Sequence, residues 1–154
     1  MAEAKTLDPQ KYGEQVNVLS VLSYHKLQDV NKLKEALETL QKENPSAVAR
    51  VPDVIPAWLG LQAYGMKDLE TADKYMTWAT QNDQLQNVKK VIWRNLAKVR
   101  LALRKYDRAL VASNNFLKDE DQPYRRADGM LDKASILLLS LIHISEPTRP
   151  EPIS

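Results

Sequence analysis

The stretch Trp93–Leu110, WRNLAKVRLALRKYDRAL, decides the fold. Its apolar residues recur every three or four positions, which is the spacing of an amphipathic helix. The pattern extends into two neighbouring helices, which we expect over about Leu85–Arg104 and Tyr106–Lys118. Ala97 stands on the first of them and Ala109 on the second. A small residue on each helix lets the two backbones approach closely, so the stretch predicts a tightly packed antiparallel pair.

A second copy of this pattern lies 37 residues upstream. The segment MKDLETADKYMTWA aligns without a gap with LRKYDRALVASNNF, which places Ala72 on Ala109 and Gly60 on Ala97. In a poorer copy, 39 residues earlier again, Leu33 takes the place of Ala72. Helix pairs that recur in this way expose a face that only a neighbouring pair can cover.

Further helices are expected along the rest of the chain. Asp29 is suited to cap one of them, and the residue before Pro45 disfavours the helical region and ends it. The segment Val48–Pro56 is interpreted as a connector, because its two prolines disfavour a strand. Ala134, 37 residues after Ala97, marks the expected start of a fourth unit. The expected ranges of these helices are about Lys11–Lys26, Val30–Lys42, Ala57–Met66, Asp68–Thr80 and Arg125–Leu138.

These repeats resemble the tetratricopeptide repeat family. The best unit matches the family pattern at Trp93, Leu96, Ala97, Tyr106 and Ala109. Another unit matches it at Leu59, Gly60, Leu69, Ala72 and Ala79. In the first unit Leu33 and Leu40 replace expected small residues, although Pro45 stands where the family has its closing proline. The period of 37–39 residues exceeds the family's, which is about 34, so the chain is described as tetratricopeptide-like. The extra residues are expected in the connectors Val48–Ile55 and Asn82–Gln86.

The resemblance implies an all-α fold, an α-solenoid of antiparallel helix pairs with about three pairs and a truncated final helix. Units are expected at about 14–47, 54–83 and 90–120, with a partial unit at 123–138, after a flexible polar lead at 1–10. It also implies a right-handed superhelix whose concave groove binds a peptide or a partner protein. The expected function is therefore that of a non-catalytic scaffold module.

Composition excludes several other classes. The 154 residues are about one domain's worth and contain no cysteine, which rules out disulfides and a thiolate zinc site. A chain without cysteine suits a reduced cytosol and also a disulfide-free periplasmic or secreted protein. The net charge of +2 is too small to indicate nucleic acid by itself. No window reaches the roughly 18 apolar residues that span a bilayer, and the N-terminus shows no signal peptide.

Residues suited to catalysis or metal binding are scarce. His25 stands alone on a predicted helix, and His143 is the other histidine. No glycine-rich phosphate loop occurs. The acidic segment Lys118–Gln122 lacks the alternating oxygen ligands and the turn glycine of a calcium loop. We therefore expect no catalytic, cofactor or metal site and no enzymatic activity.

Candidate partner-binding residues lie on two predicted helices. In the repeat register Arg94, Asn95 and Lys98 lie largely toward the groove, where the two cations could hold a carboxylate of a bound peptide. The alternative is that these residues form a solvated basic face. Leu61 and Tyr64 are the candidate contacts of the preceding unit. For Tyr64, a position in the core is an equally supported interpretation. The full set of polar clamp residues is missing. Trp58 and Trp78 are expected in the core.

Two alternative functions stay open. Helical repeats can bind RNA, and a basic cluster would serve that purpose, but Asp107 interrupts it and no aromatic residue is interleaved with it. The cluster consists of Arg100, Arg104, Lys105 and Arg108. The other alternative is a helical appendage of a larger enzyme or assembly complex.

The tail of the chain has a different character. The segment LSLIHISEPTR, Leu139–Arg149, resembles the direct translation of a transposase adapter used to prepare sequencing libraries. Residues 139–154 are therefore interpreted as non-native and excluded from functional inference. We expect the last native helix to leave a partly uncovered face at Ile136, Leu137 and Leu138, and we expect the chain to self-associate through it or to be poorly soluble.

Overall fold

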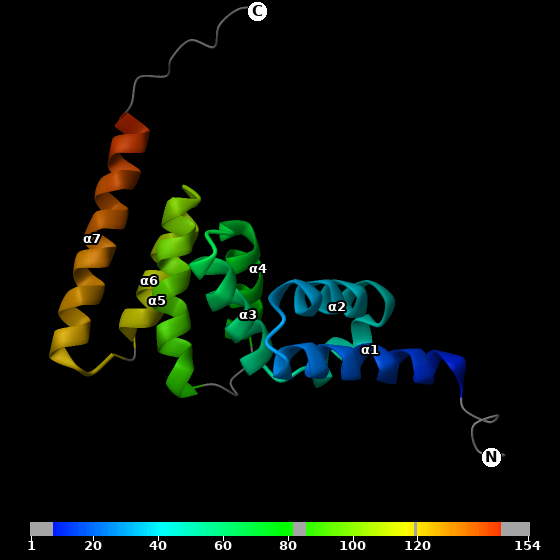
Figure 1. The fold of residues 1–154 in the computed structure, drawn as a ribbon. Coiled ribbons are helices and arrows are strands. Elements are labelled where there is room, and N and C mark those ends of the chain that lie inside the picture. Colours follow the sequence, from blue (N-terminus) through cyan, green and yellow to red (C-terminus); the bar gives the residue numbers. More distant parts are fainter. Residues whose placement is uncertain (1–7, 82–85, 119, 146–154) are drawn as a thin grey trace, which may run out of the picture. The chain divides into compact units, whose positions relative to one another are not determined.

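A computed structural model describes residues 8–81, 86–118 and 120–145. These residues contain helices and no strand, which confirms the all-α class (Figure 1). The elements are α1 Pro9–Lys26, α2 Val30–Glu43, the 3₁₀-helix η2 Pro45–Arg50, α3 Val54–Gly65, α4 Leu69–Thr80, α5 Gln86–Ala102, α6 Tyr106–Lys118 and α7 Pro123–Ser145.

The chain divides into two compact units, described separately below. The first unit, residues 1–85, contains α1 to α4, and the second unit, residues 86–154, contains α5 to α7. In the first unit α1 packs on α2 and α3 packs on α4, while η2 joins the two pairs. In the second unit α6 packs on both α5 and α7.

Three helices begin at an aspartate that acts as N-cap. Asp8 accepts a hydrogen bond from the Gln10 backbone N–H at 3.0 Å. Asp29 accepts one from Lys32 at 3.1 Å, and Asp68 accepts one from Thr71 at 3.3 Å. Each bond satisfies a backbone donor that the first turn of a helix leaves without a partner. The predicted cap Asp29 is confirmed.

The same turn joins the helices of three successive pairs. Gln28, Lys67 and Arg104 adopt positive φ angles of 56°, 62° and 60°, and each lies just after the first helix of its pair. In each turn the next residue donates its backbone N–H to the carbonyl five positions back, as Asp68 does to Ala63 at 2.9 Å. This is the Schellman arrangement, in which a left-handed residue lets the chain satisfy the last carbonyls of a helix.

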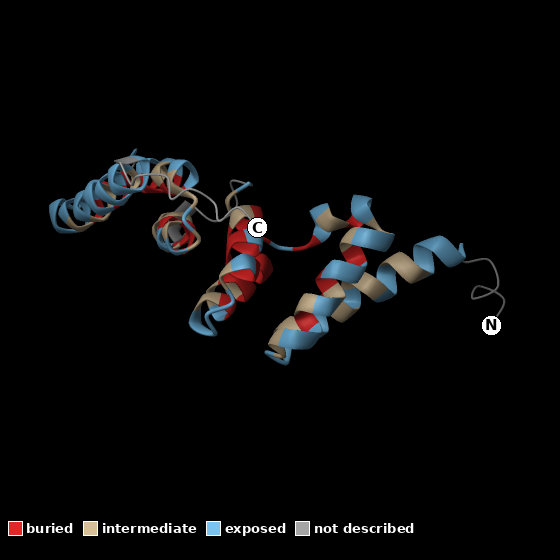
Figure 2. Cartoon of the chain, turned by 90° about the horizontal axis from the view of Figure 1, so that it is seen from above, coloured by how far each residue is buried: buried red, intermediate tan, exposed pale blue. Residues whose placement is uncertain are grey.

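The core of the first unit is one continuous apolar cluster that spans both helix pairs. Leu33, Leu37 and Leu40 of α2 form its centre and are fully buried. Trp78 belongs to this cluster, and Trp58 packs against it, so both tryptophans lie in or on the core as expected. Figure 2 colours the buried residues red, and they alternate along the helices with intermediate and exposed residues.

Small residues allow close helix approach at two places. A Cβ on Gly60 would lie 2.7 Å from Met76 Cγ and 3.0 Å from the Met76 backbone nitrogen, so α3 and α4 come together there as predicted. In the second unit Gly129 of α7 has this role, because its Cβ would lie 2.5 Å from the ring of Phe116. Ala134, expected to start a fourth unit, is exposed, and that unit stays a prediction.

Several expected boundaries are wrong. The first helix begins at Pro9, so the polar lead is shorter than expected, and its residues 1–7 lie outside the described part. The helix α3 begins at Val54, inside the expected connector, because Pro56 occupies its first turn, where no backbone N–H is needed. Of the connector expected at 82–86, residues 82–85 also lie outside the described part.

The last helix is longer than expected. It continues past Leu138 to Ser145, since no proline or glycine interrupts residues 130–145 and the His143 ring packs 5.3 Å from that of Tyr106. The non-native origin of residues 139–154 stays a prediction. Leu137 and Leu138 are exposed as expected, but Ile136 is only 2% exposed, because it faces the inside of the unit.

Candidate peptide-binding cleft

The residues expected to bind a partner do not share one unit. Leu61 and Tyr64 lie half-buried on α3 in the first unit. Arg94, Asn95 and Lys98 lie on α5 in the second unit. Arg94 and Lys98 are one helical turn apart, as the sequence indicated.

Arg94 already has carboxylate partners within its own unit. Its Nε donates to Asp132 Oδ2 at 3.1 Å, and its Nη2 lies 3.9 Å from Asp128 Oδ2. The guanidinium also lies over the Phe116 ring, 5.8 Å from its centroid. The guanidinium therefore ties α7 to α5, and the carboxylates of Asp128 and Asp132 take the place that the sequence analysis gave to a peptide carboxylate.

The other two residues of this group, Asn95 and Lys98, differ in their surroundings. The Asn95 side-chain amide donates to the Val91 carbonyl of its own helix at 3.0 Å. Lys98 is exposed. Partner binding by these residues stays a prediction, in which Lys98 is the most accessible cation.

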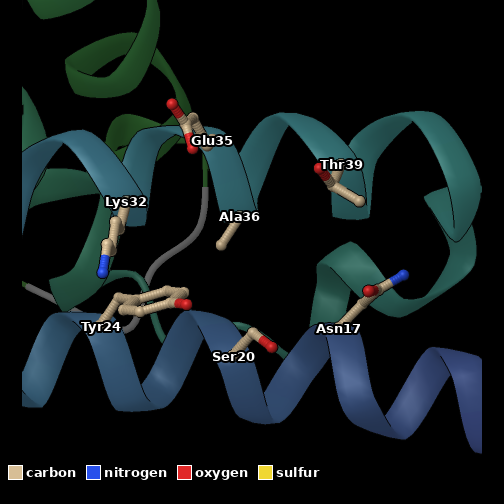
Figure 3. A pocket seen from close by; sticks show the side chains of 7 residues that line it. All are labelled: Asn17, Ser20, Tyr24, Lys32, Glu35, Ala36 and Thr39. Atoms are coloured by element: carbon tan, nitrogen blue, oxygen red, sulfur yellow. The ribbon is translucent and has the colours of Figure 1, made fainter.

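A different site lies between α1 and α2, where the two helices leave an open cleft of about 270 Å³. Polar side chains dominate its walls, and the small side chain of Ala36 leaves room in the middle (Figure 3). The helix α1 contributes Asn17, Ser20 and Tyr24, and α2 contributes Lys32, Glu35, Ala36 and Thr39.

The two ends of the cleft differ in chemistry. At one end the Lys32 ammonium lies 5.8 Å from the centroid of the Tyr24 ring, which places a cation beside a phenol (Figure 3). At the other end Asn17 donates its amide to Asn44 Oδ1 at 2.8 Å and to Glu43 Oε2 at 3.0 Å. These bonds hold Asn17 in place at the junction of α1 with the end of α2.

Ser20 lies between the two ends of the cleft. Its hydroxyl donates to the Val16 carbonyl of its own helix at 2.8 Å, so its oxygen can accept a hydrogen bond from a ligand. This hydroxyl has a backbone carbonyl and not a base as its hydrogen-bond acceptor, and the residues that line the cleft include no histidine. The cleft therefore presents groups for binding and no activated nucleophile.

The sequence analysis missed this site, although a signal for it exists. Positions 17, 20 and 24 recur at helical spacing as polar residues on a face of α1 next to the apolar one. Positions 32, 35 and 39 do the same on α2. Two adjacent polar stripes that face one another across a helix pair would have indicated the cleft.

The basic cluster considered for RNA is smaller than expected. Arg100 is only 6% exposed, and its Nη1 donates to the Arg108 carbonyl at 3.0 Å, so it does not contribute to a basic surface. A second cleft, of about 420 Å³, lies beside the remaining basic residues. It is lined by Arg104, Lys105, Tyr106, Asp107 and Arg108, together with Ser140, His143 and Ile144 from the segment interpreted as non-native.

The geometry defines an all-α protein of paired helices with an open polar cleft. No family model, no curated protein and no solved structure matches the chain. Within residues 8–81, 86–118 and 120–145, no helix is long and apolar enough to cross a membrane. The same residues contain no group of three acidic or histidine side chains placed to hold a metal ion.

Proposed function

We propose that this chain is a non-catalytic, tetratricopeptide-like module that binds a peptide segment of a partner protein. The observation that carries the proposal is the open cleft between α1 and α2, with its cation at one end and its hydroxyl and amide groups along the walls. The repeat character is supported by the three equivalent turns at Gln28, Lys67 and Arg104, which follow one another at 39 and 37 residues.

The length of the cleft suits a short extended peptide. Asn17 and Tyr24 are seven residues apart on α1, which corresponds to roughly 10 Å at about 1.5 Å per residue. An extended peptide rises about 3.3 Å per residue, so roughly three of its residues lie along the cleft. Its backbone groups can be met by the Thr39 hydroxyl, which can donate or accept, and by the Ser20 oxygen, which can accept because the Ser20 proton is donated to the Val16 carbonyl.

The charges of the cleft favour an acidic group at one end of the peptide. The Lys32 ammonium and the Tyr24 hydroxyl lie on the same side and can both donate to a carboxylate. Glu35 lies on the rim and disfavours a second acidic group nearby. We therefore propose a ligand with one carboxylate, either an acidic side chain or a free C-terminus. The exposed Lys98 and the half-buried Leu61 and Tyr64 remain proposed contacts for other parts of the partner.

Selection from a random peptide display library on the full chain tests this proposal. Selected peptides should carry an acidic group, and their affinity, measured by fluorescence anisotropy, should fall about tenfold or more in Lys32→Glu, because a favourable charge contact becomes a repulsive one. Lys42→Glu is the matched control, since Lys42 is exposed on the same helix and does not line the cleft.

A steric variant tests the location independently of charge. Ser20→Trp should fill the cleft and abolish peptide binding while circular dichroism shows unchanged helicity. The proposal is wrong if the library yields no binder, or if selected peptides bind Lys32→Glu and Ser20→Trp as tightly as the parent chain.

A further inference from the structure

The helix α1 carries an exposed apolar stripe that does not belong to the cleft. Tyr12 and Leu19 are each 59% exposed, and Val16 is 43% exposed. Successive residues of a helix turn by about 100°, so these three side chains lie on the side of α1 opposite the buried Val21. We call the three residues the α1 stripe. In Figure 2, α1 is the helix next to the N label, and exposed and intermediate residues make up almost all of its length.

The repeat register relates the α1 stripe to positions on α3. The turns of the two helix pairs lie 39 residues apart. The same shift places Val21 on Gly60, and each of these residues is buried on the side of its helix that faces the second helix of its own pair. It also places Leu33 on Ala72, and both are fully buried. The shift therefore aligns equivalent faces of the two helix pairs.

On α3 the positions equivalent to the α1 stripe are covered. Val16 corresponds to Ile55, which is only 1% exposed, and Leu19 corresponds to Trp58, which is half-buried. Ile55 belongs to the apolar cluster whose centre is formed by the leucines of α2, and Trp58 packs against that cluster. The main neighbour of this face of α3 is therefore α2, the second helix of the preceding pair. The molecule itself thus shows that an amphipathic helix covers this face.

A charge pair accompanies the packing of α2 beside the second helix pair. The Lys34 ammonium of α2 lies 3.7 Å from the carboxylate of Asp68, which caps α4. The 39-residue shift relates Asp68 to Asp29, which caps α2 in the same way. A helix that had the position on α1 that α2 has on α3 would therefore place its own lysine beside Asp29.

We propose that the α1 stripe docks an amphipathic helix of a partner protein in the position that α2 has on α3. The partner helix has the pattern of α2, with leucines at spacings of four and three residues and a lysine directly after the first leucine. A second copy of this chain cannot supply such a helix without unfolding, because the leucines of its own α2 are fully buried. None of the three stripe residues lines the cleft, so this docking surface is separate from the peptide-binding site proposed above.

Fluorescence anisotropy with a labelled peptide of residues 29–44, which contains the sequence of α2, tests the proposal on the full chain. A hydrocarbon staple between positions 31 and 35 keeps the peptide helical, because an isolated helix of this length is marginal in water and both positions are exposed in the folded chain. We expect saturable binding that weakens about tenfold or more in Val16→Glu and in Leu19→Glu, because each variant places a charge in the apolar contact.

Matched controls are available on both sides of the contact. Val54→Glu on α3 introduces the same charge at a valine that is 48% exposed and lies outside the stripe, so it should bind the peptide like the parent chain. A stapled peptide with Leu33→Ser and Leu37→Ser should not bind, because it lacks the apolar side chains that the stripe requires. Circular dichroism of each variant of the chain checks that α1 still folds.

A double-mutant cycle tests the orientation of the docked helix. Asp29→Asn removes the charge of the chain but keeps a residue that caps a helix, and Lys34→Gln in the peptide removes the opposite charge. Each change should weaken binding about threefold, as for an exposed ion pair. The two changes together should weaken binding no more than either alone, because both remove the same contact. Additive losses would contradict the proposed orientation.

Three results would overturn the docking surface itself. The first is no binding of the stapled peptide to the full chain. The second is binding to Val16→Glu and Leu19→Glu as tight as binding to the parent chain. The third is a dimer of the chain alone, seen by sedimentation velocity, that Val16→Glu dissociates, because that result assigns the stripe to a second copy.

Discussion

The two helix pairs of the first unit share one kind of turn but differ in how tightly their two helices pack. The helix α3 buries six of its residues fully, and Gly60 brings its backbone against α4. The helix α1 buries only Val21 fully, and the space that it leaves beside α2 is the polar cleft. The same kind of turn therefore joins a tightly packed helix pair and an open one. The side chains that face the partner helix decide how closely the two helices pack.

The largest expected difference in stability between the two pairs comes from replacing one glycine by leucine in each pair. In Gly60→Leu the new side chain meets the Met76 backbone, so the free energy of unfolding should fall by about 3 kcal/mol. In Gly13→Leu on α1 the new Cβ meets nothing within 4 Å. That variant should be neutral or more stable by about 0.5 kcal/mol, because leucine favours a helix more than glycine does.

Urea unfolding followed by circular dichroism measures both variants. Equal destabilisation by the two substitutions would show that the pairs are packed alike and would contradict the comparison.

The glycine at the α3–α4 contact could be predicted from sequence, and so could most helices. The position of Gly60 follows from the 37-residue register, and the cap at Asp29 follows from local pattern. Such features depend on residues close together in the chain, where periodicity and capping preference act. The start of α3 was missed because Pro56 was interpreted as a breaker, although proline is compatible with a first turn.

The candidate site could not be predicted in the same way. The cleft depends on how two helices sit side by side, since Asn17 of α1 and Thr39 of α2 line the same cleft only after the two helices have packed. The partners of Arg94, Asp128 and Asp132, lie more than 30 residues away in the chain, and the repeat register does not pair them with it. Sequence periodicity identifies the exposed faces of helices but not which charged groups of other helices reach them.

A smaller effect on the free energy of unfolding is expected at alkaline pH, and it arises in the tightly packed pair. Burial raises the pKa of Tyr75 on α4, and the nearby charge of Glu38 adds to this. The folded chain therefore keeps the phenol protonated at a pH where the unfolded chain ionises it. The stability from this group is complete below about pH 10, the ordinary pKa of tyrosine. It is lost as the pH rises above that value, at about 1.4 kcal/mol per pH unit.

Tyr75→Phe removes this dependence. The difference in unfolding free energy between the variant and the parent chain should grow in favour of the variant from pH 10 to pH 11, as measured by urea titration at each pH. At neutral pH Tyr75→Phe should be slightly more stable than the parent, because the buried hydroxyl has no hydrogen-bond partner among the described residues. Tyr24→Phe removes a hydroxyl from the open cleft and is the control; a matching alkaline response in it would contradict the assignment to Tyr75.

The turns provide the smallest and most selective test, because they are what the two pairs have in common. Gln28 joins α1 to α2 and Lys67 joins α3 to α4, both with φ near 60°, a conformation that disfavours any residue with a Cβ. Glycine there should stabilise the chain by about 0.5 kcal/mol, the relief of strain being partly offset by the greater freedom of glycine in the unfolded chain. The helix-interior control Glu38→Gly should lose about 1 kcal/mol. Equal gains in stability in Gln28→Gly and Lys67→Gly would show that the turns of the two pairs are equivalent. The difference in packing between the pairs would then arise from the helix faces alone. A gain in stability at only one of the two positions would show that part of the difference in packing arises from the turn.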